Sequence, residues 1–244
     1  MNEKVLVIGV GEIGRPLLEL IGEKYDAYGL DIKPGEPIPR CDIMHICFPF
    51  NGEEFVQETV NYIGKYQPSL AIINSTVAVG TTRKIAKESG TPVVNSPVRG
   101  KHAKMKQDLL HYTKFVGSDS KSAGERAAEH WSSLGLRTKL LSSPEASELA
   151  KLTETTYFGV LIAWAQEVER YCDKVGANYD EVVSFYEEIG FFPPVKYLPG
   201  VIGGHCVLPN IKILKKSFRS GILEAIEKSN EIKRGGPAAG GWTP

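Results

Sequence analysis

The sequence predicts an α/β fold in which a doubly wound parallel sheet is followed by a long helix and a small all-helical domain. Over residues 1–143, short runs of β-branched and aliphatic residues alternate with segments of helical apolar spacing. A stretch from 144 to about 174 then has one glycine and no proline after its first position, which is typical of one long helix. We therefore expect a sheet domain at 1–143, a helical domain at 144–234 and a flexible tail at 235–244.

The first strand and the turn after it predict a dinucleotide site. An aliphatic run typical of a buried parallel strand, Val5-Leu6-Val7-Ile8, leads directly into Gly9-Val10-Gly11-Glu12-Ile13-Gly14 and then into helical spacing. Gly9 permits the turn, Gly11 leaves room for a pyrophosphate, and Gly14 lets the helix lie close to the strand. The helix N-terminus favours an anion. We expect a Rossmann-type site in which Gly9, Gly11, Glu12, Ile13 and Gly14 contact the cofactor.

The second predicted strand, at 27–30, ends at an acidic residue. Asp31 lies 17 residues after Gly14, where a carboxylate accepts hydrogen bonds from the adenosine ribose and repels a 2′-phosphate. NAD is therefore favoured over NADP, although Lys33 lies nearby. We include Ile32 and Lys33 in the expected cofactor site. The alternative for Asp31 is a solvated turn before Pro34.

Further strands are predicted at 41–48, 70–74, 92–95, 114–117 and 137–141, with helices at 53–65, up to about 89, and at 121–134. Ligands of doubly wound sheets lie beyond the carboxyl ends of the strands, so Pro49 and Ser75 are expected at the cofactor. Residues 96–112 are expected to form a basic loop that contains Arg99 and Lys101. This loop is either simply solvated or faces an anionic substrate.

Composition and charge exclude several classes of function. Lysine plus arginine and aspartate plus glutamate both number 29, so no nucleic-acid partner is expected. Neither a signal peptide nor a membrane span is visible, and we expect a cytoplasmic protein. The four cysteines have no Cys-x-x-Cys spacing, which favours reduced thiols over disulfides or a metal site.

The predicted helix at 144–174 is the basis for an expected homodimer. At 1.5 Å per residue it is about 45 Å long, and its middle, from Tyr157 to Trp164, is apolar around much of its circumference. A helix of this kind is buried on all sides, so a second subunit is the natural cover. The alternative is a helical cap within the chain, formed by residues 179–190 and 211–234.

A loop rich in glycine and proline, 190–210, contains His205 and Cys206. From the residues alone, Cys206 is either a nucleophile with a depressed thiol pKa or a small buried apolar side chain.

Five motifs together resemble one family, the UDP-glucose/GDP-mannose (nucleotide-sugar 6-) dehydrogenases. They occur in the family's order: Gly9-Val10-Gly11-Glu12-Ile13-Gly14, Ser75-Thr76-Val77-Ala78-Val79-Gly80-Thr81-Thr82, Ser96-Pro97, Glu148-Leu149-Ala150-Lys151-Leu152, and Pro199-Gly200-Val201-Ile202-Gly203-Gly204-His205-Cys206.

The resemblance implies an enzyme that oxidises a sugar CH₂OH with two NAD⁺. Cys206 is then the nucleophile that traps the aldehyde, Lys151 stabilises the oxyanion, and Thr76 lies near the cofactor and a catalytic water. Thr155, His205 and Asn210 are expected, with Arg99 and Lys101, to face the substrate, which is a nucleotide sugar or a smaller anionic molecule.

Three positions depart from the family pattern. Val98 stands where the family has a glutamate that activates water, Thr155 replaces an asparagine, and Asn210 replaces an aspartate. The loss of a carboxylate near the thiol changes the path of the protons on which oxidation depends. The chain also stops at about the point where the family's second Rossmann domain begins.

Two alternatives therefore remain. One is a β-hydroxyacid dehydrogenase of the 6-phosphogluconate type, which would use Lys151 and not Cys206. The other is a non-catalytic NAD-binding module whose partner supplies the missing domain.

Overall fold

The computed structural model describes residues 3–31, 40–100, 105–189 and 198–235. The chain divides into two compact units, Met1–Lys151 and Leu152–Pro244, and each is described by itself. The division falls inside one long helix, α6 (Pro144–Val175). The domain boundary at 143/144 therefore stays a prediction.

The first unit contains a seven-stranded sheet in the order β2-β1-β3-β4-β5-β6-β7. The strands are β1 (Lys4–Ile8), β2 (Asp26–Leu30), β3 (Ile43–Ile46), β4 (Leu70–Ile73), β5 (Val93–Asn95), β6 (Lys114–Gly117) and β7 (Thr138–Leu141). The first five are parallel to one another. The predicted doubly wound, Rossmann-type α/β fold is confirmed.

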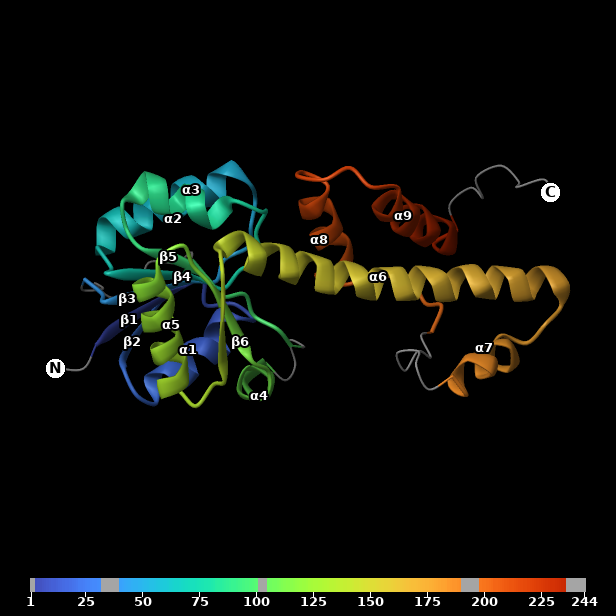
Figure 1. Ribbon diagram of the computed structural model, residues 1–244, viewed down its shortest axis with the longest axis horizontal. Helices are drawn as coiled ribbons and strands as arrows, with labels where there is room; N and C mark the ends of the chain where they lie inside the picture. Colours follow the sequence, from blue (N-terminus) through green and yellow to red (C-terminus); the bar gives the residue numbers. More distant parts are fainter. Residues whose placement is uncertain (1–2, 32–39, 101–104, 190–197, 236–244) are drawn as a thin grey trace. The chain divides into compact units, whose positions relative to one another are not determined.

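Helices cover both faces of this sheet (Figure 1). One core cluster joins Val5 and Val7 of β1 to α1 (Gly14–Gly22) and α5 (Lys121–Ser133). The opposite cluster joins Leu6 and Ile8 to α2 (Glu53–Tyr66) and α3 (Thr81–Ser89). Successive residues of a strand point to opposite faces, so a continuous aliphatic run is what a sheet covered on both sides requires.

The last two strands differ from the parallel arrangement that we expected. β6 pairs with β5 in the antiparallel sense, at Asn95 and Gly117, and β7 runs parallel to β6. The apolar pattern of a strand is the same in both directions, so the sequence did not reveal this reversal.

The expected loop at 96–112 also contains a helix, α4 (Met105–His111). Met105 and Leu109, one turn apart, are buried in the same core cluster as α1. Two buried residues are too few to reveal a helix of seven residues from sequence periodicity.

The second unit packs three helices against the remainder of α6: α7 (Tyr179–Glu187), α8 (Val207–Leu214) and α9 (Gly221–Lys233). The segment 211–233, which we expected to be helical, is interrupted: α8 ends at Leu214 and α9 begins at Gly221. A Cβ on Gly159 of α6 would lie 2.8 Å from Val207 and 3.5 Å from Ile226. These two residues would be about 28 Å apart on one straight helix, so the chain must turn between them to place both at Gly159.

Among the described residues, none of the helices combines the length and the apolar character that a bilayer crossing demands.

Candidate functional site

The glycine-rich turn after β1 has the close approaches that a dinucleotide fold needs. Gly9 has φ of +88°, and a Cβ there would lie 2.7 Å from the backbone nitrogen of Phe48. A Cβ on Gly14 would lie 1.9 Å from the carbonyl oxygen of Gly9, so no other residue fits. A Cβ on Gly11, in contrast, would meet no protein atom within 4 Å. The turn is closed against the sheet and open at Gly11, which suits a pyrophosphate.

The helix that follows this turn has no cap of its own. Ile13 is the N-cap residue of α1 and makes no side-chain cap hydrogen bond, so the dipole and the first N–H groups of the helix favour an anion. Gly9 N–H donates to Leu30 O at 2.8 Å and joins the ends of β1 and β2. Asp31 therefore follows directly beside the turn, and it is exposed, as are Gly11 and Glu12. Ile32 and Lys33 lie outside the described residues.

Other predicted residues lie at the carboxyl ends of β3 and β4. Pro49 is exposed, Ser75 is buried and Thr76 is half-buried. The Ser75 hydroxyl donates to Phe48 O at 2.6 Å, so this side chain holds the segment after β3 against the end of β4. The predicted roles of Pro49, Ser75 and Thr76 at a cofactor remain predictions.

The segment after β5 carries the first departure from the family pattern. Val98 is buried among core residues that include Val94 and Leu109. The Arg99 guanidinium lies 5.2 Å from the ring centre of Tyr112 and 5.6 Å from that of Phe115, within cation–π range. Lys101 lies outside the described residues.

The sequence did not reveal a series of buried polar side chains, linked by hydrogen bonds, below the carboxyl edge of the sheet. Lys114 Nζ donates to Ser96 O at 2.5 Å and to Asn74 Oδ1 at 3.2 Å. Asn74 Nδ2 then donates to His45 Nδ1 at 3.1 Å. The Nε2 atoms of His45 and His130 are 3.0 Å apart and form the next hydrogen bond. Burial, with a smaller contribution from the charge of Lys151, lowers the pKa of Lys114 to about 7. Lys114 has the same strand parity as buried Val116, a signal that could have shown that it points inward.

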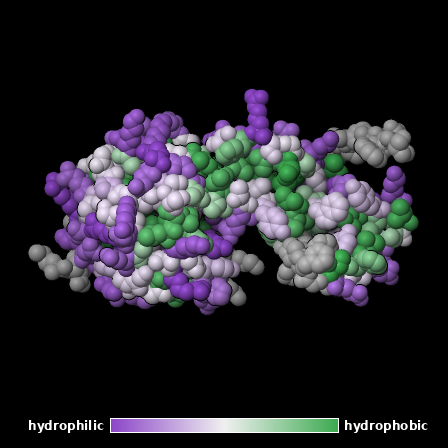
Figure 2. Space-filling view, viewed as in Figure 1, coloured by the Kyte–Doolittle hydropathy of each residue, from purple (hydrophilic) through white to green (hydrophobic). Residues whose placement is uncertain are grey.

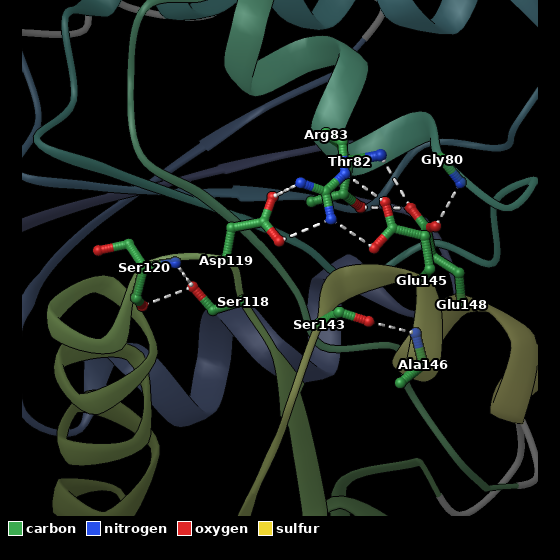
Figure 3. Close-up of polar contacts among 10 residues, drawn as sticks. All are labelled: Gly80, Thr82, Arg83, Ser118, Asp119, Ser120, Ser143, Glu145, Ala146 and Glu148. Carbon is green, nitrogen blue, oxygen red and sulfur yellow. Dashed lines mark hydrogen bonds and ion pairs between the residues drawn. The ribbon is translucent and has the colours of Figure 1, made fainter.

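The first turns of α6 are attached to the sheet unit by three side chains, two of which, Glu145 and Glu148, are drawn in Figure 3. Glu148 accepts hydrogen bonds from the start of α3, Glu145 pairs with Arg83 at 2.6 Å, and Ser147 Oγ donates to Asn95 Oδ1 at 2.7 Å. Lys151 follows Glu148 by three residues and is half-buried.

The second unit holds the remaining candidate residues. Cys206 is exposed and is the N-cap residue of α8, and the Asn210 N–H donates to its carbonyl oxygen at 3.0 Å. The preceding loop is clamped to the helices, because Gln166 donates to Gly200 O at 2.7 Å and the Ile202 N–H donates to Asn230 at 2.7 Å.

The two replaced polar residues of this unit bond to each other. Asn210 Nδ2 donates to Thr155 Oγ1 at 2.9 Å, and Thr155 Oγ1 donates to Leu152 O at 3.0 Å. Asn210 is buried, Thr155 is half-buried and the neighbouring His205 is exposed. An asparagine amide and a threonine hydroxyl thus form a neutral pair where the family pattern has an aspartate and an asparagine.

Comparison with known proteins places these motifs in context. Residues 145–232 match the sequence model described as "UDP-glucose/GDP-mannose dehydrogenase family, central domain". A UDP-N-acetyl-D-mannosamine dehydrogenase of Methanococcus vannielii is 26% identical in an alignment of 257 positions, gaps included, that covers 84% of this chain. The chain spans 59% of the length of that relative.

Two solved structures share the fold. A UDP-D-ManNAc dehydrogenase of Pyrococcus horikoshii aligns with a TM-score of 0.84 at 20% identity, over 95% of this chain and 69% of that one. The 3-hydroxyisobutyrate dehydrogenase of Mycobacterium tuberculosis aligns with a TM-score of 0.76 at 15% identity, over 95% of this chain and 94% of that one. The resemblance predicted from the sequence is therefore confirmed: residues 145–232 match the central-domain model of the UDP-glucose/GDP-mannose dehydrogenase family, and the relatives that align with this chain include UDP-N-acetyl-D-mannosamine dehydrogenases.

Proposed function

We propose that this protein is an NAD-dependent dehydrogenase that oxidises a CH–OH group, with the primary alcohol of a nucleotide sugar as its first candidate substrate. The observation that carries the proposal is that one chain combines two features. The glycine-rich turn Gly9–Gly14 after β1, which we call the glycine corner, leads into a helix without a side-chain cap, and residues 145–232 match the family's central domain. The Methanococcus vannielii relative is a UDP-N-acetyl-D-mannosamine dehydrogenase, so that nucleotide sugar is the first compound to test.

The residues at the glycine corner fit NAD. Gly11 leaves space for the pyrophosphate and the N-terminus of α1 supplies N–H donors, and we propose exposed Asp31 as the acceptor for the ribose hydroxyls. When bound, NAD⁺ supplies the hydride acceptor. The negative charge of Asp31 favours NAD over NADP.

Cys206 and Lys151 are the residues that we propose for the chemistry. The first oxidation converts the alcohol to an aldehyde, with loss of a hydride and a proton. The Cys206 thiolate then adds to the aldehyde carbon, and loss of a second hydride leaves a thioester that water cleaves to the acid and the free thiol. The Lys151 ammonium offsets the negative charge on the substrate oxygen, and Thr76 lies near the water.

The neutral Thr155–Asn210 pair supports a slower second half-reaction. The Thr155 hydroxyl proton is already donated to Leu152 O, and the Asn210 amide cannot accept a proton as a carboxylate does. Release of acid from the thioester is therefore the step that we expect to limit turnover.

We also propose a homodimer through α6. Tyr157, Trp164 and Tyr171 recur every seven residues on this helix, and about half of each side chain is exposed in the single chain. Figure 2 shows that apolar and polar residues are interspersed on this face of the molecule, so the stripe is identified from the exposure of its three side chains. Side chains with this spacing form one stripe, which suits a second copy of the same helix.

A β-hydroxyacid dehydrogenase is the second candidate. It is favoured by the alignment with 3-hydroxyisobutyrate dehydrogenase, which spans nearly the whole of both chains. In that case the reaction stops at the carbonyl product and Lys151 alone acts on the substrate oxygen. A non-catalytic NAD-binding role is the third, because three polar positions of the family pattern are replaced.

One screen separates these candidates. NADH absorbance is measured with UDP-N-acetyl-D-mannosamine, UDP-glucose, GDP-mannose and 3-hydroxyisobutyrate. For the nucleotide-sugar route, Cys206→Ser should lower acid formation at least 100-fold and still allow slow aldehyde formation, because a serine hydroxyl is a far weaker nucleophile. Unchanged NADH production by Cys206→Ser would favour the hydroxyacid route. No NADH with any compound, together with measurable NAD binding, would favour the non-catalytic role.

A further inference from the structure

The start of α3 cannot provide its own cap. Gly80, the N-cap residue, has φ of +91°, a conformation that favours glycine, and a glycine has no side chain with which to bond the first N–H groups. The N–H groups of Gly80 and Thr82 therefore need an acceptor from elsewhere in the chain.

Glu148 of α6 is that acceptor (Figure 3). One carboxylate oxygen accepts from Gly80 N–H at 2.6 Å, and the other accepts from Thr82 N–H at 2.8 Å and from the Thr82 hydroxyl at 2.6 Å. The three donors come from one turn, 66 to 68 residues away in the sequence. The residue is 1% exposed, and burial raises the pKa of the carboxyl group, while these hydrogen bonds oppose the rise.

The cap joins two segments that carry candidate catalytic residues. The loop that ends at Gly80 begins with Ser75 and Thr76, at the carboxyl end of β4. Glu148 lies three residues before Lys151 on α6, so the two are on adjacent turns of one helix. A carboxylate held by three donors fixes both segments more firmly than a single hydrogen bond would.

We propose that Glu148 is a positioning residue, which fixes the turn of α6 that bears Lys151 against the loop that bears Thr76. This inference rests on the proposed function. Misplacement of a catalytic group by about 1 Å can cost up to 100-fold in rate, so loss of the cap should act on turnover.

The test compares Glu148→Gln with Arg83→Met. The glutamine keeps the size of the side chain, but its NH₂ group faces donors and leaves at least one of them without an acceptor. Arg83→Met removes the exposed ion pairs that α3 makes with Glu145 of α6 and with Asp119, which precedes α5, and it leaves the cap intact. Turnover of the substrate found in the screen, KM for NAD⁺, and amide hydrogen exchange of residues 75–82 and 147–151 are measured well below the melting temperatures.

We expect kcat of Glu148→Gln to fall at least tenfold, while its KM for NAD⁺ stays within twofold of the wild-type value. Amide hydrogens of residues 75–82 and 147–151 should both exchange faster than in the wild type. Arg83→Met should keep kcat and exchange within twofold. Glu148→Asp, which keeps the charge but is one methylene shorter, should lie between the wild type and Glu148→Gln, and it serves if the glutamine variant does not fold.

An active wild type whose Glu148→Gln variant keeps its kcat would overturn this inference alone. An equal fall of kcat and NAD⁺ affinity would also overturn it, because that is the signature of general destabilisation. A wild type that oxidises none of the probes defeats the proposed function, and the positioning role fails with it.

Discussion

His45 and His130 are buried inside the sheet unit, and their hydrogen bonds fix which ring nitrogen carries the proton. Asn74 uses its oxygen for Lys114, so its NH₂ group must donate to Nδ1 of His45. His45 Nε2–H then donates to His130 Nε2, which leaves the Nδ1–H of His130. That atom is buried and has no partner among the described residues. This series of hydrogen bonds thus ends in an unsatisfied N–H donor, and neither imidazole ring has a free nitrogen lone pair that could bind an additional proton.

We therefore expect acid to destabilise the protein through this pair. Burial lowers the pKa of His130 to about 4 and that of His45 well below 6.5. The unfolded chain takes up these protons below about pH 6.5 and the folded chain does not, so stability falls as the pH drops from about 6.5 to 4. The slope is about 1.4 kcal/mol per pH unit for each histidine.

Urea unfolding at pH 7.0, 5.5 and 4.5 measures this effect. His130→Asn should reduce the pH dependence of the unfolding free energy by about one proton, or about 1.4 kcal/mol per pH unit. Equal slopes for wild type and His130→Asn would contradict the assignment.

At the scale of the elements, Gly159 shows how α6 receives α8 and α9. Its missing Cβ is what allows Val207 of α8 and Ile226 of α9 to contact the same turn. A glycine in the middle of a helix costs about 1 kcal/mol in helix propensity, and the close packing of two helices offsets this cost.

We expect Gly159→Ala to destabilise the second unit although alanine is the better helix former. The added Cβ would lie 2.8 Å from Val207, and overpacking of this kind costs about 1–3 kcal/mol. The matched control is Gly64→Ala in α2, where a Cβ would meet nothing within 4 Å, and which should stabilise by about 0.5–1 kcal/mol. Thermal unfolding followed by circular dichroism measures both, and equal shifts of the same sign would contradict the packing argument.

At the scale of the whole molecule, the proposed homodimer depends on the aromatic stripe of α6, which consists of Tyr157, Trp164 and Tyr171. Introducing one charge into it, as Trp164→Glu, should raise the dimer dissociation constant at least tenfold, or about 1.4 kcal/mol. Phe185→Glu, which changes an exposed aromatic of α7, should have no such effect. Sedimentation velocity over a dilution series measures both variants. A monomeric wild type, or an unaffected Trp164→Glu dimer, would contradict the predicted interface.

The sequence by itself determined the fold class and the glycine corner. Both depend on local pattern: strand and helix periodicity, and three glycines whose spacing is set by one turn. The extent of α6 was predicted to within a residue of its end at Val175, because a run without internal proline and with suitable capping is a local property.

Only the tertiary structure decided the direction of β6, the break between α8 and α9, and the partners of the polar residues. Lys114 reads as an ordinary strand residue, and Glu148 as an ordinary helix residue, until residues 18 to 68 positions away are brought against them. Hydrogen bonds of this kind join groups that share no sequence pattern. Their selection depends on which backbone donors and acceptors the packed sheet and helices leave to be satisfied.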